Sequence, residues 1–168
     1  MSKLPRLLTR HRGTLTLNRV VLADLHRTGW DAYPNETGGI LLGHHASVGR
    51  FGAVVVRQLV GPGPAAVHEP RRFEPDHEWQ AAQVAEHWAR DQSLEYLGDW
   101  HTHPRGSVDP SPLDRATLRA ISAFPDANQP NPVMLIIALH PHRSHLGATV
   151  LFCGRAFSTL RVALEPNS

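Results

Sequence analysis

The feature that most constrains the fold of this chain is an uninterrupted apolar run, VMLIIAL, at residues 133–139. A strand with one face in solvent alternates apolar and polar residues, whereas a strand covered on both faces is apolar throughout. The run therefore predicts a central strand in a sheet whose two faces are both covered.

Hydrophobic spacing and turn residues predict the elements around this strand. No regular element is expected before Asn18, which is a candidate N-cap. The inner face of the second helix would carry Trp79, Ala82, Ala85 and Trp88. Residues 65–72 are predicted to form an exposed loop. The predicted helices span residues 19–32, 75–93 and 111–124, and the remaining strands span 39–44, 51–60, 94–103, 146–153 and 157–164.

This order of elements is typical of an α/β fold, a mixed β-sheet with helices packed on its faces. The 168 residues fit a single domain, 1–168, with residues 1–12 and 165–168 expected to be flexible. No apolar run approaches the length of a membrane span, and the basic start lacks the apolar core of a secretory signal. We therefore expect a cytoplasmic protein. Seventeen basic and 15 acidic residues favour neither nucleic acid nor a membrane as partner.

Two histidines, one residue apart, end the strand predicted at 94–103. Because side chains alternate along a strand, His101 and His103 point to the same side. Asp114 follows a loop rich in proline and glycine that can return the chain to them. Two imidazoles and one carboxylate leave an open position on a tetrahedral zinc, which is typical of a catalytic site.

Other interpretations of these residues stay open at this level. Twelve histidines in the chain make a chance His-x-His pair plausible. Ser111 and Asp114 also fit a helix capping box, although a capping carboxylate keeps an oxygen that can reach a metal. Glu36 lies at another predicted boundary and is a candidate base for hydrolysis. The glycines after it, such as Gly38, permit close approach of backbone or substrate.

Residues 36–43, ETGGILLG, resemble the ExxGxLxG segment of the JAMM (JAB/MPN-type) zinc metallopeptidases. Residues 101–114 match the HxHPx6SxxD motif of that family without a gap. The resemblance implies an MPN-type fold, similar to that of cytidine deaminases. It also implies that His101, His103 and Asp114 hold one catalytic Zn²⁺ with a bound water, that Glu36 shuttles a proton and that Ser111 stabilises the oxyanion.

The same resemblance implies a peptidase or isopeptidase that cuts after the C-terminal tail of a ubiquitin-like protein, or of a protein conjugated in that manner. Its expected partners are that substrate and activating- or conjugating-enzyme-like proteins, including those of bacterial antiphage systems. An edge strand beginning near Gly38 and the loop 62–73 are candidate walls of the substrate groove. The alternatives are a non-catalytic MPN scaffold and a processing peptidase for a sulfur-carrier protein.

Two further groups of residues carry weaker expectations. Cys153 lies in an apolar run, which predicts a buried thiol without a catalytic role. His140, His142 and His145 lie close together in the sequence, but their spacing fits no metal site, and we expect them in a solvated turn.

Overall fold

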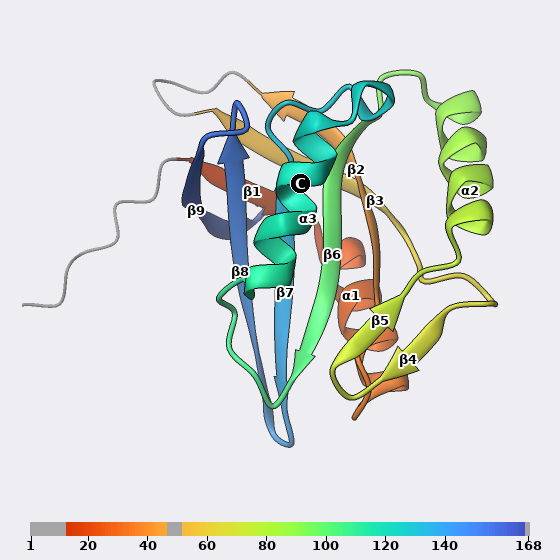
Figure 1. The fold of residues 1–168 in the computed structure, drawn as a ribbon, viewed down its shortest axis with the longest axis vertical. Coiled ribbons are helices and arrows are strands. Elements are labelled where there is room, and N and C mark those ends of the chain that lie inside the picture. The colour runs from red at the N-terminus through yellow and green to blue at the C-terminus, as the bar shows by residue number, and fades with distance from the viewer. Residues whose placement is uncertain (1–12, 47–51, 167–168) are drawn as a thin grey trace, which may run out of the picture.

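The computed structural model describes residues 13–46 and 52–166, which form a barrel of strands with helices packed around it (Figure 1). Its elements are β1 (Thr14–Leu17), α1 (Arg19–Ala32), β2 (Gly38–Ala46), β3 (Ala53–Val60), β4 (Val67–Glu69), β5 (Arg72–Glu74), α2 (His77–Arg90), β6 (Glu95–Pro104), α3 (Pro112–Ala123), a short 3-10 helix (Pro125–Ala127), β7 (Val133–His140), β8 (Arg143–Phe152) and β9 (Ala156–Leu164).

Seven strands close into a barrel in the order β1-β3-β2-β6-β7-β8-β9, while β4 and β5 form a separate hairpin. The pairing is mixed: β6 is parallel to β7, and β1 is parallel to both β3 and β9, but the other pairs are antiparallel. The predicted α/β class with a mixed sheet is confirmed. Closure was not predicted, because β1 lies in the segment where we expected no regular element.

Strand β7 is buried on both faces, as its apolar run predicts. Leu135 and Ile137 pack in the main core with Leu25 of α1. Ile136 faces the other way and packs with Leu118 of α3. Helices α1 and α3 accordingly lie on opposite sides of this strand (Figure 1). One strand thus joins the two parts of the core.

Helix α1 has the predicted bounds, and Asn18 caps it by accepting a hydrogen bond from the Val21 N–H at 2.8 Å. Gly29 near its end has a packing role. A Cβ at this position would lie 3.1 Å from Cγ2 of Thr102 and 3.3 Å from Cδ1 of Leu139. Glycine therefore lets α1 approach β6 closely, next to the two histidines.

Helix α2 starts at His77, two residues after the predicted start, and ends at Arg90. Its predicted inner face was wrong except at Trp79, which is half-buried. Ala82, Ala85 and Trp88 are exposed, with Trp88 54% exposed, and Gln80 is the one buried residue of this helix. The helix stands beside the barrel (Figure 1), and a cleft lined in part by Val84 and Trp88 separates it from β2 and β6. Helical spacing showed an apolar face but not what covers it.

The predicted loop at residues 65–72 was also wrong, because it contains β4 and the start of β5. Each strand of this hairpin has three residues, too few to show an alternating pattern. His68 and Phe73 are opposite each other, and their ring centroids lie 5.5 Å apart. In Figure 1 the hairpin lies near the C-terminal end of β6.

Cys153 is exposed and has a φ of +47°, so the prediction of a buried thiol was wrong. The reason is that β8 ends at Phe152, which leaves Cys153 in the turn to β9.

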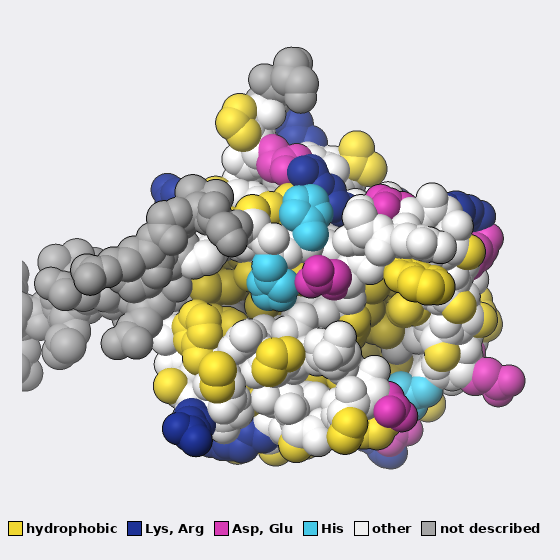
Figure 2. All heavy atoms as spheres, turned by 90° about the horizontal axis from the view of Figure 1, so that it is seen from above, with side chains coloured by type: hydrophobic (Ala, Val, Ile, Leu, Met, Phe, Trp, Pro, Cys, Tyr) yellow, Lys and Arg dark blue, Asp and Glu magenta, His cyan; other side chains and the backbone are white. Residues whose placement is uncertain are grey.

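Near the C-terminus, the Glu165 carboxylate accepts hydrogen bonds from the Arg57 guanidinium at 2.6 and 2.7 Å, although we expected a flexible tail there. Residues 1–12 and 167–168 lie outside the described residues. Among the described helices none is long and apolar enough to cross a membrane. On the end of the barrel seen in Figure 2, acidic and basic side chains are interspersed without a patch of one sign.

Candidate metal centre

The C-terminal end of β6 presents two imidazoles on one face of the sheet. The Nε2 atoms of His101 and His103 lie 2.9 Å apart, and their side chains are 12% and 15% exposed. The alternation of side chains along the strand, with the buried Thr102 facing the other way, accounts for this arrangement.

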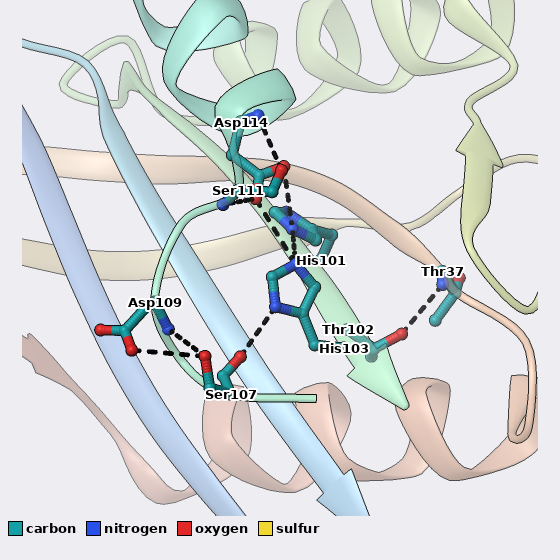
Figure 3. Close-up of polar contacts among 8 residues, drawn as sticks. All are labelled: Thr37, His101, Thr102, His103, Ser107, Asp109, Ser111 and Asp114. Carbon is teal, nitrogen blue, oxygen red and sulfur yellow. Dashed lines mark hydrogen bonds and ion pairs between the residues drawn. The ribbon is translucent and has the colours of Figure 1, made fainter. Parts of the chain in front are cut away.

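Asp114 completes the group from the first turn of α3 (Figure 3). Its Oδ1 lies 3.3 Å from Nε2 of His101, and its Oδ2 lies 3.4 Å from Nε2 of His103. One ligand atom from each of the three residues falls within 4.8 Å of the others. The loop after β6 thus returns the chain to the histidines.

The capping box that the sequence suggested is present at the same residues. The Ser111 N–H donates to Asp114 Oδ2 at 2.6 Å, and the Asp114 N–H donates to Ser111 Oγ at 3.2 Å. Oδ1 of Asp114 makes neither of these bonds and faces His101. The Asp114 carboxylate therefore caps α3 and lies beside the two histidines at the same time.

A backbone carbonyl determines which ring nitrogen of His103 carries a hydrogen. Its Nδ1 lies 2.7 Å from the Ser107 oxygen, and because a carbonyl only accepts, Nδ1 must carry the hydrogen. In the neutral ring this leaves the Nε2 lone pair directed at His101 and Asp114. A hydrogen bond from the remote ring nitrogen to a carbonyl is the usual support of a metal-binding histidine.

The charges of the cluster favour a cation between its side chains. Burial raises the pKa of Asp114, but hydrogen bonds from His101 and His103 outweigh burial and hold this pKa well below its usual range. Burial lowers the pKa of His103, but bonds to Asp114 and Ser107 outweigh it, and that pKa is raised. The ionised carboxylate thus stabilises a positive charge beside it, whether a proton or a metal ion.

Glu36 is brought to the cluster by the pairing of β2 with β6. Gly38 lies opposite His101, and the next pair is joined by the Thr102 N–H donating to the Thr37 carbonyl at 2.8 Å. Glu36 is the residue before Thr37, and its carboxylate is close enough to interact electrostatically with His101, His103 and Asp114. Burial raises the pKa of Glu36, against the lowering effect of the His101 and His103 charges.

The groove walls predicted from the sequence need correction. Strand β2 is not an edge, because it pairs with β3 on one side and β6 on the other. A Cβ on Gly38 would lie 2.5 Å from the Trp100 carbonyl oxygen, and one on Gly39 only 1.9 Å from that of Val60. These glycines therefore serve the close approach of the protein's own strands.

The donor set fits a single metal ion. The two imidazole nitrogens lie 2.9 Å apart, and the two oxygens of the Asp114 carboxylate lie 3.3 and 3.4 Å from them, an arrangement that suits bonds of about 2 Å to one Zn²⁺. Three protein ligands leave a fourth position for water or substrate, as in catalytic zinc sites. No second group of this kind was found within residues 13–46 and 52–166. His142 and His145 are exposed at the β7–β8 hairpin, but His140 is half-buried at the end of β7 and His145 lies in β8, so the three do not share a solvated turn as predicted.

Sequence reasoning missed a polar pair on the same strand. The Tyr96 hydroxyl donates to Asp99 Oδ1 at 2.8 Å, and burial raises the pKa of both groups. Asp99 lies two residues before His101, on its face of the sheet. A β-bulge at Gly98, where φ is +136°, brings Tyr96 to that face as well. The glycine within a predicted strand was the available signal.

Comparison with known proteins extends the resemblance over most of the chain. Residues 18–148 match the family described as prokaryotic homologs of the JAB domain. A solution structure of a protein from Desulfitobacterium hafniense superimposes with a TM-score of 0.68 at 21% identity, covering 92% of this chain and 94% of that one. At this identity the likeness concerns the fold alone.

Two curated relatives have names that refer to an activity. A protein of Sinorhizobium fredii, named a probable metalloprotease, is 34% identical over 108 residues, 63% of this chain and 64% of the relative. A protein of Enterobacter hormaechei subsp. hoffmannii, named a CD-NTase/cGAS isopeptidase, is 33% identical over 131 residues, 77% of this chain and 71% of the relative. The chain thus spans just under two thirds of the first relative's length.

Proposed function

Because this chain belongs to the family of prokaryotic JAB-domain proteins, we propose that it is a zinc-dependent peptidase or isopeptidase. It hydrolyses the bond after the C-terminal tail of a ubiquitin-like protein, or of a protein conjugated in a ubiquitin-like manner. The observation that carries this proposal is the convergence of His101, His103 and Asp114 beside Glu36. The isopeptidase name of the Enterobacter relative supports a protein conjugate as substrate.

The zinc would be held by His101, His103 and Asp114, which supply two neutral ligands and one negative ligand. When bound there, zinc supplies Lewis-acid polarisation of the scissile carbonyl and of the attacking water. The carbonyl of Ser107 keeps the His103 ring in the orientation that this role needs.

Glu36 acts as the general base and then as the general acid. It accepts a proton from the attacking water and returns it to the leaving amine. Its raised pKa suits both steps, because a base works best when its pKa is near the working pH. The side chain is half-buried, which limits competing exchange with bulk water.

Ser111 stabilises the oxyanion. Its Oγ accepts the hydrogen bond from the Asp114 N–H, so the hydroxyl hydrogen is free to be donated to the substrate oxygen. The helix start fixes the position of Oγ before substrate arrives. This pre-organisation is what makes a donor effective in catalysis.

The substrate tail pairs as an added strand with the β4–β5 hairpin. Strand β2 has both edges occupied, whereas β4 and β5 form a sheet of only two strands. An extended tail ending in Gly-Gly fits a narrow groove because its last two residues have no side chains.

The partners are then the conjugate and the activating- and conjugating-enzyme-like proteins of a bacterial antiphage conjugation system.

The test is cleavage of defined fusions by the purified, zinc-loaded protein. Ubiquitin-like and sulfur-carrier proteins are each fused through their C-terminal tails to a fluorescent protein, and products are identified by mass spectrometry. Cleavage directly after a tail by the wild type, but not by Glu36→Gln, supports the proposal and selects the substrate class. Stoichiometric zinc without cleavage of any fusion contradicts it and favours a non-catalytic scaffold.

A further inference from the structure

The β4–β5 hairpin contacts the backbone of Glu36 on both of its polar groups. The Glu36 N–H donates to the Glu69 carbonyl at 2.8 Å. The Glu36 carbonyl lies 2.9 Å from Nδ1 of His68, and because a carbonyl has no hydrogen to give, His68 is the donor. The backbone of the proposed base is therefore bonded to the hairpin.

The residue that follows is bonded to the barrel instead. Thr37 donates its N–H to Thr102 Oγ1 and accepts the Thr102 N–H at its carbonyl, at 3.0 and 2.8 Å. Glu36 thus lies at the point where the chain passes from one set of bonds to the other. The barrel fixes its C-terminal neighbour, and the hairpin fixes Glu36 itself.

Phe73 holds the His68 ring in place. The two rings are tilted by 32° with centroids 5.5 Å apart. On its other side, Cε1 of Phe73 lies 2.9 Å from where a Cβ on Gly38 would be, and Gly38 is paired with His101. The ring of Phe73 therefore spans from His68 to the strand pair that carries the metal-binding residues.

We propose that His68 is a positioning residue that fixes the carboxylate of Glu36 for proton transfer. This inference rests on the proposed function, because it takes Glu36 as the base. His68 acts through the Glu36 carbonyl, with its ring packed against Phe73. Removing it takes the donor from the Glu36 carbonyl and leaves the Glu36 segment with fewer bonds, but removes neither a metal ligand nor a contact of Ser111.

The experiment compares His68→Ala with His68→Asn, whose side-chain amide nitrogen can occupy the place of Nδ1. In cleavage of the ubiquitin-like fusion, His68→Ala should lower kcat about tenfold, since displacement of a catalytic group by a fraction of an ångström is costly, and should leave KM within about twofold. His68→Asn should recover most of the loss. Zinc content should stay at one ion per chain in both variants.

Hydrogen exchange supplies a readout that does not depend on activity. The amide of Glu36 is protected by its bond to Glu69, so His68→Ala should speed exchange of the peptide containing Glu36, and His68→Asn should not. His45→Asn is the matched control, because His45 is exposed near the far end of β2. It should behave as wild type in both assays.

Two results overturn the inference: unchanged kcat and exchange in His68→Ala, or an Asn variant as impaired as the Ala variant. A third pattern, raised KM with unchanged kcat, also overturns it, because it assigns His68 to substrate binding. If the wild type cleaves no fusion, the proposed function fails, and exchange at Glu36 alone decides whether His68 fixes this segment.

Discussion

Thr102 holds Thr37 across 65 residues of chain: the Thr37 N–H donates to Thr102 Oγ1 at 3.0 Å, and the Thr102 N–H donates to the Thr37 carbonyl at 2.8 Å. Thr102 stands between the two histidines, and Thr37 follows Glu36. Both threonines are fully buried. The pair therefore sets the position of the proposed base relative to the strand that carries His101 and His103.

Replacing Thr102 by valine should weaken this link while keeping the shape of the side chain. The buried Thr37 N–H loses its acceptor, which should cost about 1–3 kcal/mol of unfolding free energy in a denaturant titration. Turnover should fall while zinc content is kept, because both histidines remain. Thr149→Val, at another buried threonine, is the control and should cost less. Equal stability of the two variants would contradict the role given to Thr102.

Glu36→Gln should separate metal binding from chemistry. The amide keeps the size of the side chain but cannot take up a proton, so turnover should fall by about 10²- to 10⁴-fold. Zinc content, measured by elemental analysis, should remain at the wild-type level because Glu36 is outside the ligand set. His103→Ala should lose both zinc and turnover. A Glu36→Gln variant that still turns over at the wild-type rate would remove Glu36 from the mechanism.

Local signals explain which parts of the fold were predictable. Helix α1 was predicted with its observed bounds because Asn18 and Pro34 mark its two ends in the sequence. Strand β7 was predicted to be central from its composition alone. The three candidate ligands were predicted to converge because strand periodicity and the following loop are encoded within residues 98–114.

The elements that were missed depend on contacts distant in sequence. Strand β1 has four residues and is fixed by parallel pairing with β3 and β9, which no local pattern shows. The link between His68 and Glu36 needed the hairpin, whose strands are too short to be recognised. The exposed face of α2 shows the same limit, since helical spacing at Trp88 does not reveal what packs against it.

Asp114→Asn should separate helix capping from metal binding. Asparagine keeps an oxygen that can accept the Ser111 N–H, so the start of α3 and the unfolding temperature of the metal-free protein should change little. Loss of the negative ligand should weaken zinc binding by more than about 100-fold, because even outer partners of a ligand contribute 10- to 100-fold. Competition with a chelator measures this affinity.

Asp114→Ala is the matched variant, which should lose zinc binding and about 0.5–1 kcal/mol of stability from the helix start. If Asp114→Asn binds zinc as tightly as the wild type, the carboxylate is a cap and not a ligand.

Ser111 and Asn18 are both N-caps, which provides an internal control for the catalytic role of Ser111. Replacing either by alanine should cost about 1 kcal/mol of unfolding free energy, because each loses one side-chain acceptor at a helix start. Only Ser111→Ala should also lower kcat, by about 100-fold, because only Ser111 adjoins the metal-binding group and can donate to the oxyanion. If the two variants lose stability equally and both keep the wild-type kcat, Ser111 serves the helix alone and the oxyanion donor must be sought elsewhere.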